Sequence, residues 1–234
     1  MLRIENLEAY YGEFQALEDV SLELPDHGVT ALLGANAAGK TTTLRVISGV
    51  LPLRSGRVVH NGDDLAKASP EERVSRGIVH VPEGRRLFGT LSVEENLLLG
   101  GYQRRKDKLA GERLDRVYDL LPKLAERRTQ MAGSLSGGEQ QMCAVGRGLM
   151  AEPKILMIDE MSLGLAPVIV KQMFEFVRTI SESGVAVLLV EQQVQHALQV
   201  ADHAVVIEKG RTVLEGTAEA VRTNDAVSEA YFGV

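Results

Sequence analysis

The chain has 234 residues, of which 44% are hydrophobic, and a formal net charge of -6. That is enough apolar material for one domain with a buried core and room for a subdomain. An acidic chain has no overall basic surface, so we expect no nucleic-acid partner. The apolar runs are too short to cross a bilayer and the first residues lack a signal-peptide pattern, which predicts a cytoplasmic location. The single cysteine, Cys143, excludes an internal disulfide.

Alternating apolar residues mark the first thirty positions. The pattern runs through Leu2–Leu7 and again through Val20–Leu24, with turn residues at Gly12 and at Pro25–Gly28. Alternation of this kind is typical of strands with one buried face, so we expect an antiparallel N-terminal β part.

A glycine-rich loop follows the apolar run Val29–Leu33. Residues Gly34–Thr41 read G-A-N-A-A-G-K-T and precede a helical pattern at Thr42–Ser48. This is the spacing of a phosphate-binding loop, in which backbone N–H groups at a helix N-terminus bind the phosphates, a lysine reaches the β- and γ-phosphates and a hydroxyl joins the Mg²⁺ shell. The alternative is a plain strand-to-helix turn with a surface lysine. The residues expected to bind the nucleotide here are Gly34, Asn36, Ala37, Ala38, Gly39, Lys40, Thr41 and Thr42.

The segment Pro70–Ala151 is predicted to be mostly helical. Its helical patterns are Glu94–Leu99, a charged amphipathic stretch over Arg104–Arg128, and a helix from about Gly137. We expect residues 1–234 to form a single domain in which about 84–152 are an inserted helical subdomain.

Three continuously apolar runs predict strands that are buried on both faces of a parallel sheet. They are Ile155–Ile158, Val185–Val190 and Ala204–Ile207, and helical patterns at Pro167–Ser181 and Gln192–Val200 separate them. The expected fold is therefore α/β, a mixed sheet with a parallel core and the antiparallel part beside it.

Two carboxylates end the first of these strands. Asp159 is placed to hold Mg²⁺ through water, and Glu160 to polarise the water that attacks the γ-phosphate. The alternative is that they cap a following helix, since acidic residues are favourable near helix N-termini.

The segment Leu135–Gln141, which we call the signature segment, reads L-S-G-G-E-Q-Q. Ser136 and Glu139 form the S-x-x-E pattern of a capping box. Two glycines at the first helical positions are unfavourable by roughly 1 kcal/mol each, which capping alone does not explain. A glycine-opened helix N-terminus also suits an anion, and both interpretations can hold together.

These motifs resemble those of the ABC transporter ATPases, a branch of the P-loop NTPases, over essentially the whole chain. The resemblance implies a head-to-tail dimer in which Ser136, Gly137, Gly138 and Glu139 contact the γ-phosphate of ATP held by a second copy. It also implies that Tyr11 stacks on adenine, although ordinary packing is the alternative for a single tyrosine in a strand.

Several positions depart from the family pattern. Glu83 stands where the family has a glutamine that senses Mg²⁺, and Gln192 stands where most members have a histidine that contacts the γ-phosphate. Leu165 replaces an acidic residue, while Ala37 and Met161 replace the usual glycine and proline.

The glutamine at 192, the run Val81–Arg86 and the tail Glu229–Gly233 resemble the second ATPase subunit of branched-chain amino acid importers. This implies ATP and Mg²⁺ as cofactors, and Lys40, Glu160 and Gln192 as catalytic residues. The implied partners are integral-membrane permease subunits, a second ATPase subunit in a hetero- or homodimer and, indirectly, a substrate-binding protein. The place of action would be the cytoplasmic face of the membrane.

Three alternatives stay open or are weighed against this function. A urea or amide importer of the same branch is the nearest. A non-transport ABC ATPase would usually carry two cassettes or long insertions, and a GTPase would need an Asn-Lys-x-Asp motif, which the chain lacks.

Overall fold

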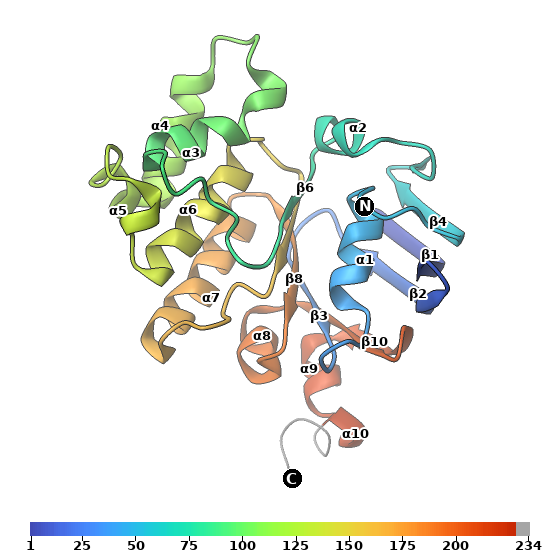
Figure 1. Cartoon of the computed structure of the whole chain (residues 1–234). Coiled ribbons are helices and arrows are strands. Elements are labelled where there is room, and N and C mark those ends of the chain that lie inside the picture. The colour runs from blue at the N-terminus through green and yellow to red at the C-terminus, as the bar shows by residue number, and fades with distance from the viewer. Residues whose placement is uncertain (228–234) are drawn as a thin grey trace.

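The computed structural model describes residues 1–227. One sheet organises them, in the order β5-β4-β1-β2-β10-β9-β3-β8-β7-β6 (Figure 1). Its strands are β1 (Leu2–Tyr11), β2 (Phe14–Leu24), β3 (Val29–Leu33), β4 (Ser55–His60), β5 (Asp63–Asp64), β6 (Ile78–Val81), β7 (Ile155–Asp159), β8 (Ala186–Glu191), β9 (His203–Glu208) and β10 (Arg211–Thr217).

The sheet has the two predicted parts. Strands β5, β4, β1 and β2 pair antiparallel, and β9, β3, β8, β7 and β6 pair parallel. Strand β10 joins them, antiparallel to β9 and parallel to β2 through the single pair Arg211 and Asp19. The expectation of a mixed α/β sheet with an antiparallel N-terminal part is confirmed.

The helices connect the strands. They are α1 (Lys40–Ile47), α2 (Pro70–Ser75), α3 (Val93–Gly100), α4 (Ala110–Leu120), α5 (Pro122–Ala125), α6 (Gly137–Leu149), α7 (Pro167–Glu182), α8 (Val194–Val200), α9 (Ala218–Arg222) and α10 (Asp225–Val227), with 3-10 turns η1 (Tyr102–Arg104) and η2 (Ala132–Ser134). Every helix between β6 and β7 lies on one side of the parallel strands in Figure 1, whereas α1 and α2 lie toward the antiparallel strands.

The parallel strands are mostly apolar because both of their faces are covered. Leu156, Ile158 and Leu189 face a core shared with α6, α7 and α8. Met157 and Leu188, the alternate residues, face a second core shared with α1 and the antiparallel strands. This double burial explains why these strands show no polar alternation.

Two parts of the predicted helical segment differ from expectation. Strand β6 lies within Pro70–Ala151 and pairs parallel with β7, because three of its four residues are apolar and buried in the sheet. The stretch Arg104–Arg128 is not one helix. It divides at Leu121, whose φ of -131° and ψ of 64° leave the helical region before Pro122, as expected of a residue that precedes proline.

The helix predicted from Gln192 begins at Val194 instead. Residues Gln192 and Gln193 form the turn between β8 and α8, and Gln193 has the non-helical ψ of 75°. The tail motif Glu229–Gly233 lies outside the described residues. No helix within residues 1–227 has both the length and the apolar character needed to cross a membrane.

Candidate functional site

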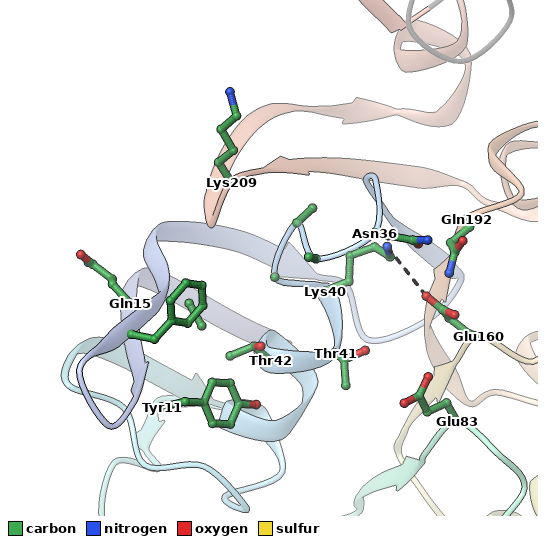
Figure 2. Close-up of a pocket in the computed structure, with 15 residues that line it drawn as sticks. Tyr11, Gln15, Asn36, Lys40, Thr41, Thr42, Glu83, Glu160, Gln192 and Lys209 are labelled. Carbon is green, nitrogen blue, oxygen red and sulfur yellow. Dashed lines mark ion pairs between the residues drawn. The ribbon is translucent and has the colours of Figure 1, made fainter.

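A cavity of about 600 Å³ opens at the carboxyl ends of the parallel strands, where ligands bind in open α/β sheets. The loops after β3, β6, β7 and β8 converge on it, and the β1–β2 turn closes one side (Figure 2). Its lining residues are Tyr11, Phe14, Gln15, Ala16, Asn36, Ala37, Ala38, Gly39, Lys40, Thr41, Thr42, Glu83, Glu160, Gln192 and Lys209. Eleven of them are residues that the sequence predicts for the site.

The phosphate loop (Gly34–Thr41) curls into the first turn of α1. At Gly34, a Cβ would lie 2.4 Å from the carbonyl oxygen of Ile207, so no larger residue fits there. Ala37 adopts a φ of 62°, a left-handed conformation that costs an L-residue roughly 1 kcal/mol or more. The glycine pattern of this loop therefore follows from close backbone packing, and Ala37 adopts a conformation that favours glycine.

Lys40 is almost completely buried within this loop, with 4% of its side chain exposed. Its Nζ donates to the carbonyl oxygens of Gly34 at 2.8 Å and Ala35 at 3.0 Å, and lies 3.9 Å from Oε1 of Glu160 (Figure 2). Burial lowers the pKa of Lys40, while Glu160 and Asp159 oppose that shift. A cation held by the loop, with a carboxylate as neighbour, is suited to attract further anionic groups.

Asp159 lies behind Thr41 at the end of β7. The Thr41 hydroxyl donates to Oδ1 of Asp159 at 3.3 Å. The other oxygen, Oδ2, is buried and has no hydrogen-bond partner within residues 1–227. Burial raises the pKa of this carboxyl to about 6. An unpartnered buried carboxylate oxygen beside a hydroxyl is the donor set that a hard cation prefers, so these residues fit Mg²⁺.

The carboxylates of Glu160 and Glu83 both face the side of the cavity formed by Lys40 and Thr41 (Figure 2). Glu160 has a φ of 46°, and its N–H donates to the carbonyl oxygen of Val190 at 2.9 Å. The alternative that Glu160 caps a helix does not apply here, because α7 begins only at Pro167. Gln192 projects into the cavity from the turn after β8.

Tyr11 lines the opposite end of the cavity, and 40% of its surface is exposed. Its hydroxyl accepts a hydrogen bond from Nη1 of Arg45 on α1 at 3.0 Å, which fixes the ring at the cavity wall. Sequence reasoning missed four further lining residues, Phe14, Gln15, Ala16 and Lys209. Phe14 is 70% exposed, and an exposed aromatic residue just after the turn that follows Tyr11 was a signal that could have identified it.

The signature segment lies outside this cavity, at the N-terminus of α6. The capping box is confirmed: Oγ of Ser136 accepts from the N–H of Glu139, and Oε2 of Glu139 accepts from the N–H of Ser136 at 2.9 Å. The hydrogen bonds from Ser136 lower the pKa of the Glu139 carboxyl, whose other oxygen pairs with Arg127 at 2.9 Å.

The glycines of the signature segment have packing reasons that the sequence did not show. At Gly138 a Cβ would lie 2.5 Å from Cγ2 of Ile169, so glycine permits the contact between α6 and α7. At Gly137 a Cβ would lie 3.1 Å from Nη2 of Arg85 and 3.3 Å from Cδ2 of Leu165. The inference that both glycines mark an anion site is thus weaker for Gly138.

Comparisons with known proteins agree with this geometry. The family described as ABC transporter matches residues 17–162. A high-affinity branched-chain amino acid transport ATP-binding protein of Pseudomonas aeruginosa is 46% identical over 233 residues, covering 100% of both chains. A probable branched-chain amino acid transport ATP-binding protein of Archaeoglobus fulgidus is 34% identical, covering 100% of this chain and 99% of that one. The lipopolysaccharide export ATP-binding protein of Escherichia coli K12 is 32% identical, covering 99% and 97%.

Solved structures give the same result. An ATP-binding cassette of an ABC transporter in its ADP conformation superimposes with a TM-score of 0.89 at 30% identity, covering 100% of this chain and 99% of that one. A nucleotide-free cassette superimposes with a TM-score of 0.88 at 30% identity, covering 99% and 98%. The chain belongs to the ABC transporter family and is an ATP-binding, ATP-hydrolysing subunit of that family.

Proposed function

We propose that this protein is one of two ATPase subunits that power a membrane importer of branched-chain amino acids. The observation that carries the proposal is the 46% identity to the Pseudomonas aeruginosa branched-chain amino acid transport protein over the full length of both chains. The export relative is only 32% identical, so import of amino acids is favoured over export of lipopolysaccharide.

The proposed roles of the site residues follow from their positions. Lys40 and the backbone N–H groups of Ala37–Thr42 bind the ATP phosphates, and the ring of Tyr11 stacks on adenine. Glu160 accepts a hydrogen bond from the attacking water and draws its proton away as the oxygen approaches the γ-phosphate. The side-chain amide of Gln192, which lines the cavity together with Glu160, donates a hydrogen bond to the γ-phosphate.

Thr41 and Asp159 are proposed to hold Mg²⁺, with Glu83 as a further ligand through water. The bound ion would neutralise charge that develops on the phosphate oxygens. The hydroxyl of Thr41 also donates a hydrogen bond to Asp159, which helps to hold the two groups together.

The signature segment is proposed to complete the site of a second ATPase subunit in a head-to-tail dimer, in which Ser136 and the N–H groups at Gly137 and Gly138 face the partner's γ-phosphate. Closure and reopening of this dimer would drive integral-membrane permease subunits from the cytoplasmic face of the membrane. Residues 1–234 would act as one domain, with about 84–152 as a helical subdomain.

The test measures uptake of labelled leucine, isoleucine and valine in cells that carry the parent gene, no gene, Lys40→Ala or Glu160→Gln. We expect uptake only with the parent. The purified variants should differ in kind: Lys40→Ala should lose ATP affinity, whereas Glu160→Gln should bind ATP and stall before hydrolysis. Parent-level uptake without the gene would contradict the proposed substrate, and uptake of urea or amides instead would identify the rival importer.

A further inference from the structure

Glu191 is a buried carboxylic acid at the end of β8 that does not itself line the cavity. Only 1% of its surface is exposed. Both of its oxygens accept hydrogen bonds from one residue: Oε1 from the N–H of Ser162 at 3.1 Å and Oε2 from the Ser162 hydroxyl at 2.7 Å. Ser162 is itself 4% exposed. A buried pair with two short contacts fixes the backbone at residue 162.

The pair lies where three strands of the site meet. In the sheet, Glu191 is opposite Leu33, the last residue before the phosphate loop, and Val190 is opposite Asp159. The N–H of Glu160 donates to the carbonyl oxygen of Val190 at 2.9 Å. The last two residues of β8 therefore hold the chain at position 160 and again at position 162.

The turn held in this way is strained. Glu160 has a φ of 46°, a conformation that costs a non-glycine residue on the order of 1 kcal/mol and that persists only when the surroundings fix it. Released from Ser162, the turn could relax and carry the Glu160 carboxylate away from Lys40. The turn's stability and the position of Glu160 are thus coupled.

Burying a carboxylic acid at this position has an unfavourable desolvation free energy. Burial raises the pKa of Glu191 to about 7, and the negative charge of Glu160 acts in the same direction. The Glu191 charge in turn raises the pKa of Lys40, though less than Glu160 and Asp159 do. An apolar side chain would pack here at lower cost. An apolar side chain, however, could not accept the two hydrogen bonds that the N–H and the hydroxyl of Ser162 donate.

We propose that Glu191 is a positioning residue for ATP hydrolysis: it holds Ser162 and so keeps the strained turn that points Glu160 at the cavity. Gln192 follows Glu191 directly and lines the cavity. The two hydrogen bonds between Glu191 and Ser162, which we call the clasp, therefore also fix the point at which the chain leaves β8 and Gln192 enters the cavity. This inference rests on the proposed role of Glu160.

The test compares Glu191→Ala and Glu191→Gln in the full chain by single-turnover hydrolysis and by ATP-binding calorimetry. Glu191→Ala should lower the hydrolysis rate about tenfold or more with ATP affinity within about twofold, because small displacements of a catalytic group are costly. Glu191→Gln should restore most of the rate, since its amide can accept from the Ser162 N–H and donate to the hydroxyl. Glu182→Ala is the control, because Glu182 is the exposed last residue of α7 and does not line the cavity.

Parent-like hydrolysis by Glu191→Ala, an equal loss in Glu191→Gln, or a parallel loss of ATP affinity would each overturn the inference. If Glu191→Ala does not fold, Ser162→Ala tests the same contact, because it removes the hydroxyl hydrogen bond and keeps the backbone one. A slower hydrolysis rate at unchanged ATP affinity would support the inference, whereas the parent rate would overturn it. Glu160→Gln separates the two proposals. If it hydrolyses ATP at the parent rate, the role of Glu160 fails and the inference with it. If it stalls while Glu191→Ala is unaffected, only the inference fails.

Discussion

At the residue scale, Ala37 is where the sequence and the backbone disagree most directly. Glycine accepts a φ of 62° without cost, whereas alanine is strained by roughly 1 kcal/mol, so the loop form that binds phosphate is less favourable in this chain. We therefore expect Ala37→Gly to tighten ATP binding up to about fivefold, as measured by calorimetry.

Ala38→Gly is the control, because Ala38 lines the same cavity and its φ is not positive. It should bring no gain in affinity. Equal or weaker ATP binding by Ala37→Gly would remove the strain argument.

Gln192 is the second residue at which a single side chain is expected to set a rate. A glutamine donates one neutral hydrogen bond, whereas a histidine that protonates also stabilises the negative charge of the transition state. Gln192→His should therefore raise the single-turnover hydrolysis rate several-fold, on the order of a charge-assisted against a neutral hydrogen bond, with little change in ATP affinity.

The neighbouring Gln193→His is a matched control, because Gln193 is exposed and does not line the cavity. A fast parent chain that Gln192→His leaves unchanged would contradict both the weak-site hypothesis and the inference of a partner subunit with a stronger site.

At the scale of elements, one capping pattern occurs on three described helices. Ser69 with Glu72, Ser92 with Glu95 and Ser136 with Glu139 each form a complete capping box, at the start of α2, α3 and α6. The pattern by itself is thus a structural signal. Ser136 has a further role only if the N-terminus of α6 faces the γ-phosphate of a partner subunit, as proposed above.

Two serine variants separate these roles. Ser92→Ala and Ser136→Ala should each lower the free energy of unfolding by about 1 kcal/mol in chemical denaturation, because each removes an N-cap. Only Ser136→Ala should also slow ATP hydrolysis, measured at saturating ATP and high protein concentration. Equal hydrolysis rates in the two variants would restrict Ser136 to capping.

At the scale of the whole molecule, His80 is expected to make the free energy of unfolding depend on pH. It lies on β6, where burial, with a smaller contribution from Arg45, lowers its pKa to about 4. Its Nε2 is buried without a hydrogen-bond partner in residues 1–227. The unfolded chain protonates this histidine near its ordinary pKa of 6.5, so between pH 6.5 and about 4 the unfolded state binds more protons.

Stability from neutral His80 is therefore present above pH 6.5 and lost as the pH falls toward 4. The expected loss between pH 7 and pH 5 is about 2 kcal/mol. Asp159 and Glu191, whose pKa values are raised, act in the opposite direction, so the measurement is the difference between the parent and His80→Gln in denaturant titrations at both pH values. A difference that does not change with pH would show that His80 is not the group responsible.

The local motifs were predictable because each is contiguous in sequence. The structure confirms that a strand, a glycine-rich turn and a helix follow one another around Gly34–Thr41, and that the apolar runs of β7, β8 and β9 are buried strands. Strand β6 was missed because three apolar residues and a histidine among helical patterns give too weak a signal, and only pairing with β7 makes them a strand. The break in the helix before Pro122 could have been predicted from the proline alone. The charged amphipathic pattern continues on both sides of it, however, and so favoured a single helix.

The family, the glycine-rich loop Gly34–Thr41 and the carboxylates Asp159 and Glu160 could be predicted from the sequence, because these depend on residue types at short, fixed spacings. Which distant residues share the site became known only from the folded chain. The contact of Glu191 with Ser162, the packing of Gly138 against Ile169 and the entry of Phe14 and Lys209 into the cavity join segments far apart along the chain. No local pattern encodes them, because the free energy that brings such residues together comes from burying the two faces of the sheet.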